Sequence, residues 1–448
     1  MSTVLLIDYG STYTKVVAVD ASNHKLLGCA SAYTTVETDV LEGLECALKE
    51  LEKQTGKIAF HKRLACSSAA GGLRMVASGL VPELTAKAAS LAAMGAGAKI
   101  IGLYSYEMTE DDIEEIAEKS PDILLLTGGT DGGNKKCILH NAEMLADISG
   151  DFPIIVAGNR NSARDVMKIL ANRRAYLCEN VMPAIGSLNI EPARQLIRDI
   201  FLEKIIHAKG LNDEVLMPTP AAVLAATELL AKEMGELMAI DLGGATTDIY
   251  SIADGEPSAA KIIYKGLPEP FAKRTVEGDI GMRYSAQGVA EEAGLSELSK
   301  LSQLNEDDVR KQVEHLSKHT DMLPKTNEEK AVDFALAAKS IEIATMRHAG
   351  LMEEYYTTSG LSYVQTGKDL TEVKNIVMTG GALINSHRQD ELVKHALYSE
   401  SQPQSLRPKK ANLLIDKNYI LSAMGLLSGY DSTAALEIMK SEMQRRKL

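Results

Sequence analysis

Two segments far apart in the chain share one pattern of apolar and polar positions. Apolar runs at 4–7 and 16–19 flank the first polar turn, and runs at 236–240 and 249–252 flank the second. Short apolar runs that enclose a Gly-, Ser- and Thr-rich turn are typical of paired strands. The pattern therefore predicts two strand–turn–strand hairpins, with a third strand at 25–32 after the first.

Apolar runs and helical periodicities alternate between residues 61 and 180. Strands are predicted at 63–68, 99–104, 122–127, 153–158 and 175–180, and helices at 82–95, 109–119, 137–149 and 161–172. This alternation is typical of a parallel sheet covered on both faces. Helices are also predicted at 40–55, 191–207, 217–231 and 431–448, with a strand near 259–264, mostly helix from 281 to 360, and a βα unit at 373–398.

A chain of 448 residues exceeds one ordinary domain. We predict an α/β protein with an N-terminal domain at 1–216, which carries an inserted α/β region at about 61–180. The C-terminal domain is predicted at 217–448, with a helical insertion at about 281–360.

Composition narrows the classes of partner. The net charge of −13, the absence of Trp and an aromatic content of 4% argue against binding to nucleic acid or to an anionic membrane. No apolar run is long enough to span a membrane, and the N-terminus lacks a signal-peptide pattern. The five cysteines lack Cys-x-x-Cys spacing, which indicates reduced thiols and a cytoplasmic location.

The turns of the two hairpins carry residues suited to a metal-bound polyphosphate. Each begins with an Asp at the end of a strand, in DYGSTYTK (8–15) and DLGGATTD (241–248). Carboxylates bind Mg²⁺, glycines admit an anion close to the backbone, and hydroxyls donate to it. A single such turn is common in hairpins, but two facing turns would clamp the phosphates from both sides. The predicted metal ligands are Asp8, Asp241 and Asp248, and the predicted phosphate contacts are Gly10, Ser11, Thr12, Lys15, Gly243, Gly244, Thr246 and Thr247.

Two further glycine-rich turns follow predicted strands. Gly380 and Gly381 lie in NIVMTGGALINS (375–386), and four glycines lie in LLLTGGTDGGNKK (124–136). Each turn is either a plain βα connection or a binding loop, and the role of Thr127–Gly133 stays open.

The order of these elements resembles the superfamily of acetate and sugar kinases, Hsp70-type chaperones and actin. The resemblance implies duplicated ribonuclease H-like domains, with ATP and Mg²⁺ in a cleft between two lobes and Gly380 and Gly381 against the adenosine. It also implies that the helix after Pro220 crosses residues 418–429, near Ala423 and Gly425, as a hinge.

One departure concerns water activation. Hsp70 chaperones carry an acidic residue where this chain has Met217 and Thr219. Glu277 and Asp279, in TVEGDIGMR (275–283), are alternative candidates, although an acidic turn that opens a helix is also ordinary capping chemistry. We take Glu277 as a catalytic candidate beside the three aspartates.

Taken over nearly the whole chain, IDYGSTYTK, LLLTGGTDGGN, DLGGATTDIYS, VEGDIGMRYS and VMTGGALINS resemble the glutamate mutase-associated MutL/GlmL family, which is unrelated to the mismatch-repair protein of that name. The resemblance implies an ATPase that reactivates an adenosylcobalamin-dependent mutase by promoting release of damaged cobalamin. The mutase served, the need for a second subunit and the oligomeric state, a homo-oligomer included, stay open.

Four other functions share parts of this pattern. A small-molecule kinase of the same fold would need a catalytic base, and none is evident in the first domain. An actin-like filament protein and a nucleotide-binding module without hydrolysis are further alternatives. An iron–sulfur activator would need clustered cysteines, which the sequence lacks.

Overall fold

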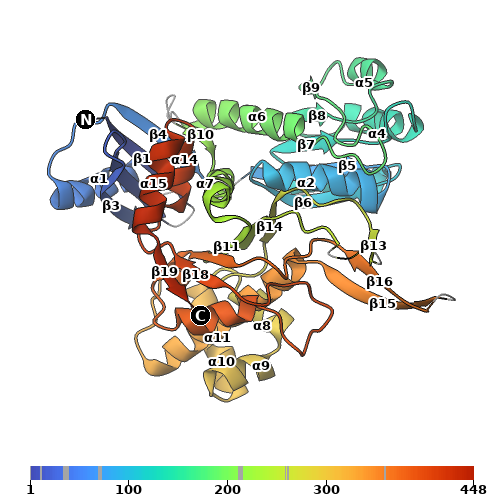
Figure 1. Ribbon diagram of the computed structural model, residues 1–448. Coiled ribbons are helices and arrows are strands. Elements are labelled where there is room, and N and C mark those ends of the chain that lie inside the picture. The colour runs from blue at the N-terminus through green and yellow to red at the C-terminus, as the bar shows by residue number, and fades with distance from the viewer. Residues whose placement is uncertain are drawn as a thin grey trace. The chain divides into compact units, whose positions relative to one another are not determined.

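The computed structural model describes residues 2–10, 13–33, 40–68, 73–209, 215–257, 259, 262–357 and 360–447. The chain forms two compact units (Figure 1). Unit 1 contains Met1–Ala226, Gly266–Pro270 and Ser422–Ile438, and unit 2 contains Thr227–Lys265, Phe271–Leu421 and Met439–Leu448. The predicted domain division between residues 216 and 217 stays a prediction.

The first sheet of unit 1 has the strand order β3-β2-β1-β4-β10. Its strands are β1 (Thr3–Tyr9), β2 (Tyr13–Asp20), β3 (Lys25–Tyr33), β4 (Lys62–Ser67) and β10 (Val215–Pro218). The first three strands are antiparallel, while β4 runs parallel to β1 and β10 parallel to β4. Helix α1 (Val40–Thr55) packs Leu44 and Leu51 into the same core as Leu5 and Ile7.

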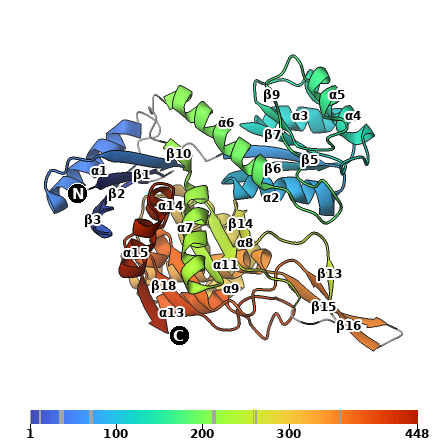
Figure 2. The same ribbon diagram turned by 45° about the horizontal axis from the view of Figure 1, so that its top comes forward.

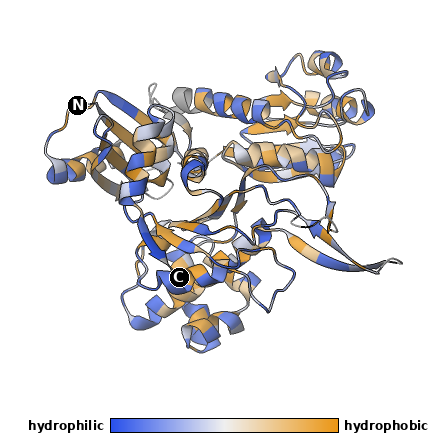
Figure 3. Ribbon diagram, viewed as in Figure 1, coloured by the Kyte–Doolittle hydropathy of each residue, from blue (hydrophilic) through white to orange (hydrophobic). Residues whose placement is uncertain are grey.

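The central sheet of unit 2 repeats this arrangement as β14-β12-β11-β17-β18, with β19 added at the edge. Its strands are β11 (Leu237–Leu242), β12 (Thr247–Ile252), β14 (Ala272–Glu277), β17 (Asn375–Thr379), β18 (Asn412–Ile415) and β19 (Gln444–Lys447). Here too an antiparallel hairpin and third strand are followed by two parallel strands. The central strands are largely hydrophobic, in contrast to the polar β19 (Figure 3).

Two sheets of one topology confirm the prediction of a duplicated, actin-like α/β fold. The structure also confirms both predicted hairpins, because β1 pairs with β2 and β11 pairs with β12 in the antiparallel sense. The predicted nucleotide cleft between lobes stays a prediction.

A second, five-stranded parallel sheet lies within unit 1, in the order β6-β5-β7-β8-β9. Its strands are β5 (Leu73–Gly79), β6 (Ala98–Ser105), β7 (Ile123–Leu126), β8 (Ile154–Val156) and β9 (Ala175–Leu177). The helices of this region are α2 (Lys87–Gly95), α3 (Glu110–Lys119), α4 (Lys136–Ala146), α5 (Ala163–Ile169) and α6 (Glu191–Lys209), with a π-helical turn at Pro82–Ala86. The sequence pattern missed β5, and the run at 63–68 belongs to the first sheet as β4.

Unit 2 also contains a group of helices between β14 and β15 (Leu351–Thr357), and a small sheet. The helices are α8 (Ala286–Ala293), α9 (Leu295–Ser302), α10 (Glu306–Lys318) and α11 (Asn327–His348), and the sheet has the order β13-β16-β15. Its strands are β13 (Ile262–Lys265), β15 (Leu351–Thr357) and β16 (Gly360–Thr366). The prediction of helix as far as residue 360 is therefore wrong beyond His348, because pairing of β15 with β16 overrides local helical character.

The C-terminal prediction also needs correction. Helix α15 (Ser432–Glu442) ends before the basic residues, and Arg445 and Arg446 lie on β19, which pairs with β18. This segment forms a strand because β18 offers an edge for pairing. The local sequence pattern does not reveal that edge.

The predicted close approach of two helices is confirmed within unit 1. Helices α7 (Thr219–Met234) and α14 (Leu421–Ser428) meet where a Cβ on Gly425 would lie 1.8 Å from the Ala222 carbonyl oxygen. Only glycine permits this approach. A hinge function for these helices stays a prediction.

Candidate functional site

Asp8 ends the central strand of the first sheet and is held by two hydroxyls. Its carboxylate is 4% exposed. Thr219 Oγ1 donates to Oδ1 at 2.7 Å, and Ser422 Oγ donates to Oδ2 at 3.0 Å. Both donors stand at the ends of the crossing helices α7 and α14, so the helix crossing fixes the orientation of this carboxylate.

Lys15 and Cys66 complete the surroundings of Asp8. They are the residues opposite Asp8 on β2 and β4. Lys15 Nζ lies 3.8 Å from Asp8 Oδ2. Burial, then the charge of Asp8, raises the pKa of the Cys66 thiol well above its ordinary value. Cys66 is therefore a neutral thiol, and Lys15 is the cation of this half-site.

The turn after Asp8 requires glycine for a steric reason. Gly10 donates its N–H to the Tyr13 carbonyl at 3.2 Å, and a Cβ on Gly10 would lie 2.5 Å from that oxygen. Ser11 and Thr12, the two predicted phosphate donors of this turn, lie outside the described residues. Their assignment stays a prediction.

The second hairpin places Asp241 and Asp248 opposite each other on β11 and β12. Asp248 is 8% exposed and forms a buried ion pair with Arg274 on β14. Arg274 Nε donates to Asp248 Oδ1 at 2.8 Å, and Thr246 Oγ1 donates to Oδ2 at 3.2 Å. Asp248 therefore already has a cationic partner, which weakens its assignment as a metal ligand, and Asp241 stays a candidate ligand in this hairpin.

The turn between these aspartates packs against residues 281–285. Gly243 and Gly244 accept backbone hydrogen bonds from Met282 at 3.0 Å and Arg283 at 2.7 Å. Gly281 is needed because its Cβ would lie 2.6 Å from the Ala245 carbonyl carbon. The neighbouring segment thus fixes the turn from behind.

The two threonines of this turn have different surroundings. Thr247 is completely buried, and its hydroxyl donates to the Ile280 carbonyl at 2.9 Å. The structure therefore gives no support to Thr247 as a side-chain donor to phosphate. Thr246 is half-buried, and its hydroxyl donates to Asp248, so it could donate to a phosphate oxygen only by giving up that hydrogen bond.

Glu277 lies at the end of β14, opposite Thr247, and not in a turn that opens a helix. Its Oε2 lies 2.6 Å from Arg347 Nη1, and Arg347 also pairs with Glu292 at 2.9 Å. Burial raises the pKa of Glu277, although Arg347 acts in the opposite direction. A carboxylate with a raised pKa beside the predicted phosphate turn is a better proton acceptor than an ordinary Glu. Asp279, the other candidate, is more exposed and lies 3.8 Å from Arg347.

The two glycines after β17 differ in what surrounds them. Gly380 has a φ of 97°, and its Cβ would lie 2.4 Å from the Leu242 carbonyl oxygen. Gly381 begins α12 (Gly381–Ile384) and would meet nothing within 4 Å. Gly380 thus serves the packing of the sheet, while Gly381 leaves open backbone of the kind expected beside an adenosine.

The Thr127–Gly133 loop is tied down by residues that follow the next two strands. Asn159 Nδ2 donates to the Asn134 carbonyl at 3.0 Å, and Asn180 Nδ2 donates to Gly129 O at 3.1 Å and to Asp131 Oδ1 at 2.9 Å. Gly129 has a φ of 72°. The loop is therefore held in a defined conformation by side chains at the carboxyl end of the inserted sheet, and its role stays open.

Several of the contacting residues were not singled out by the sequence pattern. Ser422 and Arg274 reach the aspartates from segments distant in the chain, and Thr219 was noted only for lacking a carboxylate. No local signal marks Ser422, although its place at the start of the helix that crosses α7 is a clue. Among the described residues, no cluster of three or more His, Cys, Asp or Glu side chains stands ready to bind a metal. Mg²⁺ that arrives with a nucleotide needs only one or two carboxylates.

No helix in the described part of the chain is both long enough and apolar enough to cross a membrane. This finding concerns helices alone.

Comparison with known proteins gives matches along the whole chain. A protein-family model described as MutL protein matches residues 4–443. The chain is 47% identical to the curated "Protein MutL" of Clostridium tetanomorphum, over 98% of this chain and 99% of that protein.

The likeness to solved structures is distant. A nucleotide-free structure of acetone carboxylase matches with a TM-score of 0.40 and 14% identity, over 95% of this chain and 70% of that one. A ligand-bound xylulose kinase from Lactobacillus acidophilus gives 0.37 and 11%, over 100% and 93% of the two chains. The activator of 2-hydroxyisocaproyl-CoA dehydratase from Clostridium difficile, with bound ADPNP, gives 0.33 and 10%, over 98% and 97%. The fold assignment rests on the two sheets of like topology.

Proposed function

Because the chain belongs to the MutL family, we propose that it is an ATP-hydrolysing reactivating factor for an adenosylcobalamin-dependent mutase. Its partner would be glutamate mutase or an aminomutase, and its action would promote exchange of damaged cobalamin in the cytoplasm. The observation that carries the ATPase part is the repeated placement of Asp8 and Asp241. Each lies near the end of the first strand of its hairpin. This strand is central in its sheet, and the two sheets have the same strand order.

ATP would be bound by the turns of the two hairpins. Asp8 and Asp241 supply the hard oxygen donors that Mg²⁺ prefers. When bound, Mg²⁺ would neutralise charge on the phosphates. Lys15 offers a cation and Thr246 a hydroxyl for phosphate oxygens, and the open backbone at Gly381 leaves room for the adenosine.

Hydrolysis would use Glu277 as the proton acceptor for water. Its carboxylate is half-buried, held by Arg347 and next to the second turn. Phosphoryl transfer asks the protein chiefly for positioning and charge stabilisation. The hydroxyls of Thr219 and Ser422 supply positioning, since they hold the carboxylate of Asp8 in one orientation.

Loss of the γ-phosphate would remove contacts on which the conformation of the hairpins depends. The crossing of α7 and α14 would serve as the hinge, because Thr219 and Ser422 join both helices to Asp8. Such a change is useful only if the mutase binds the two nucleotide states with different affinity.

The decisive experiment mixes the protein with cyanocobalamin-inactivated glutamate mutase, ATP, Mg²⁺ and excess adenosylcobalamin. Mutase activity should return with ATP and not with a nonhydrolysable analogue. Asp8→Asn should abolish the rescue, whereas the control Asp307→Asn, at an exposed position of α10, should leave it intact. Failure across a panel of such mutases, together with transfer of the γ-phosphate to a small molecule, would favour the kinase alternative.

A further inference from the structure

The small sheet β13-β16-β15 of unit 2 exposes an unusual amount of apolar surface. Figure 2 shows β15 and β16 extending as a hairpin beyond the helices of their own unit. Five large apolar side chains of these three strands are exposed, with values from 43% to 85%: Ile263, Leu351, Tyr355, Tyr356 and Leu361. By strand register, Ile263, Leu351 and Tyr355 lie on one face of the sheet and Tyr356 and Leu361 on the other, so both faces offer apolar contacts to a partner protein.

One edge of β15 has backbone groups that point away from the sheet. Met352 donates its N–H to the Gln404 carbonyl at 2.8 Å, so this residue faces away from β16. Directions alternate along a strand, and therefore the N–H and C=O groups of Glu354 and Tyr356 point to the same side. The described residues provide no partner for them there, and such an edge can accept a further strand.

A cavity lies along this edge. It has a volume of about 560 Å³ and is lined by Met352, Glu353, Glu354, Tyr355, Tyr363, Pro403 and Gln404. Pro403 and Gln404 line it on the side opposite β15, and the Gln404 carbonyl accepts the hydrogen bond from Met352 at the start of that strand. The space thus adjoins the outward-facing backbone of Glu354.

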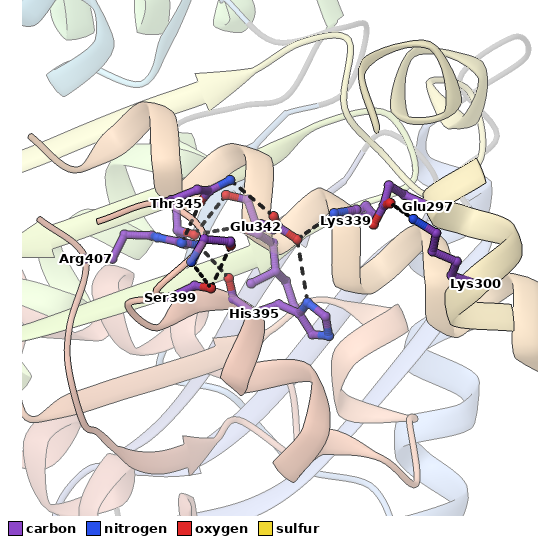
Figure 4. A network of polar contacts seen from close by, with 11 residues as sticks. Glu297, Lys300, Lys339, Glu342, Thr345, His395, Ser399 and Arg407 are labelled. Atoms are coloured by element: carbon purple, nitrogen blue, oxygen red, sulfur yellow. Dashed lines mark hydrogen bonds and ion pairs between the residues drawn. The ribbon is translucent and has the colours of Figure 1, made fainter. Parts of the chain in front are cut away.

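The segment that carries Pro403 and Gln404 forms one wall of this cavity and is fixed by hydrogen bonds of its neighbours. Arg407, which is 1% exposed, donates to the His395 carbonyl at 3.0 Å and to Gln402 Oε1 at 2.7 Å. Figure 4 shows Arg407 and His395 joined to Glu342 of α11 in one network. His395, whose Nδ1 lies 3.7 Å from the carboxylate, and then Lys339 lower the pKa of Glu342 to about 2 against the effect of burial, so this carboxylate stays ionised. The network anchors the segment that carries Pro403 and Gln404.

The charges along the edge of β15 indicate which kind of peptide segment can bind there. β15 carries Glu353 and Glu354 beside two tyrosines, and the basic residue of the small sheet, Lys265, lies on the opposite edge strand. Tyrosine faces and carboxylates together suit lysine or arginine side chains. A second copy of β15 is disfavoured, because like charges would lie opposite each other.

We propose that the free edge of β15 binds an extended segment of a partner protein, one in which two neighbouring basic residues adjoin two neighbouring apolar ones. The segment adds a strand beside Glu354 and Tyr356. Because neighbouring residues of a strand point to opposite faces, its two basic side chains pair with Glu353 and Glu354, one on each face, and its two apolar side chains cover Tyr355 and Tyr356. This site does not depend on the proposed ATPase function.

The test is selection of random twelve-residue displayed peptides on the full chain. Enriched peptides should carry two neighbouring Lys or Arg residues next to two neighbouring apolar residues. Their binding should fall at least tenfold in the double variant E353K/E354K and in Glu354→Pro, which removes the outward N–H. The matched control E306K/D307K, on the exposed start of α10, should bind like the wild type.

Three results would overturn the proposal. These are enrichment of acidic or wholly apolar peptides, equal binding by the wild type and the charge-reversed variant, and the absence of any enrichment. Self-association that sedimentation detects in the wild type and not in E353K/E354K would assign the edge to a second copy instead. Circular dichroism and a thermal melt of each variant verify that the chain is folded.

Discussion

The two hairpins share a topology but differ in the charge opposite the key aspartate. Asp8 faces Lys15 across the first hairpin, whereas Asp241 faces Asp248 across the second. In the second hairpin the balancing cation, Arg274, comes from the third strand and reaches Asp248. The two hairpins therefore share their backbone arrangement and the carboxylate on their first strand. The cation, however, lies on the second strand in one case and on the third strand in the other.

This difference separates a binding cation from a structural one. Lys15 has a side chain that is 21% exposed and can turn toward a ligand, whereas the Arg274 side chain is 3% exposed and is committed to Asp248. Burial by itself would lower the pKa of Arg274, but Asp248 and Tyr250 raise it. The first hairpin thus offers its positive charge to a ligand, whereas the cation paired with the second hairpin joins β14 to β12.

The largest expected effect follows from removing the structural cation. Arg274→Met should destabilise unit 2 by about 3–5 kcal/mol, because the charge of Asp248 is left buried and unpaired. Lys15→Met should cost less than about 1 kcal/mol, since this cation is partly solvated. Urea unfolding, with amide exchange on β12 and β14, measures both. Equal losses would remove the distinction, and adding Asp248→Asn to Arg274→Met should restore part of the stability.

The next effect tests whether both aspartates act in hydrolysis. Asp8→Ala and Asp241→Ala should each lower the ATPase rate by about 10²-fold or more, as expected for loss of a charge that acts on the transition state. Steady-state phosphate release measures the rate. A near-normal rate in either variant would assign the chemistry to one hairpin alone and reject the symmetric site.

Glu277 has no counterpart beside the first hairpin in the proposed mechanism, and this asymmetry makes a pH prediction. Its pKa is raised, so the carboxylate takes up a proton at a higher pH than an ordinary Glu and the ATPase rate should fall as the pH drops through that value. Glu277→Gln should lower the rate by about 10²-fold and flatten this acid limb. Asp279→Asn is the matched control, because it removes a more exposed carboxylate near the same arginine. An unchanged pH profile in Glu277→Gln would rule out this base.

The comparison also explains which features could be predicted from the sequence. Both hairpins were evident because each is local, with an Asp, a glycine turn and two apolar runs in one stretch. β5 was missed because LRMVASG interrupts its apolar run with Arg74, and only pairing with β6 and β7 makes it a central strand.

Contacts between distant segments were harder to predict than local turns. Arg274 and Ser422 reach their aspartates across 26 and 414 residues, and neither has a local pattern that names its partner. The crossing near Gly425 was predicted because the resemblance to the superfamily implied it, and the small residues of both helices permit it. β19 was not, since its pairing with β18 depends on an edge that only the folded sheet provides.

The smallest expected effect concerns how Asp8 is oriented. Thr219→Val removes the 2.7 Å hydrogen bond to Asp8 while keeping the shape of the side chain. A hydrogen bond to a charged group contributes about 1.5 kcal/mol or more, so the ATPase rate should fall about tenfold and half-saturation should need more Mg²⁺. Thr219→Ser keeps the hydroxyl and should restore both values, which a purely structural role for the side chain would not explain. If Val and Ser behave alike, Ser422 and the helix crossing hold Asp8 without Thr219, and the first hairpin is less dependent on α7 than its geometry indicates.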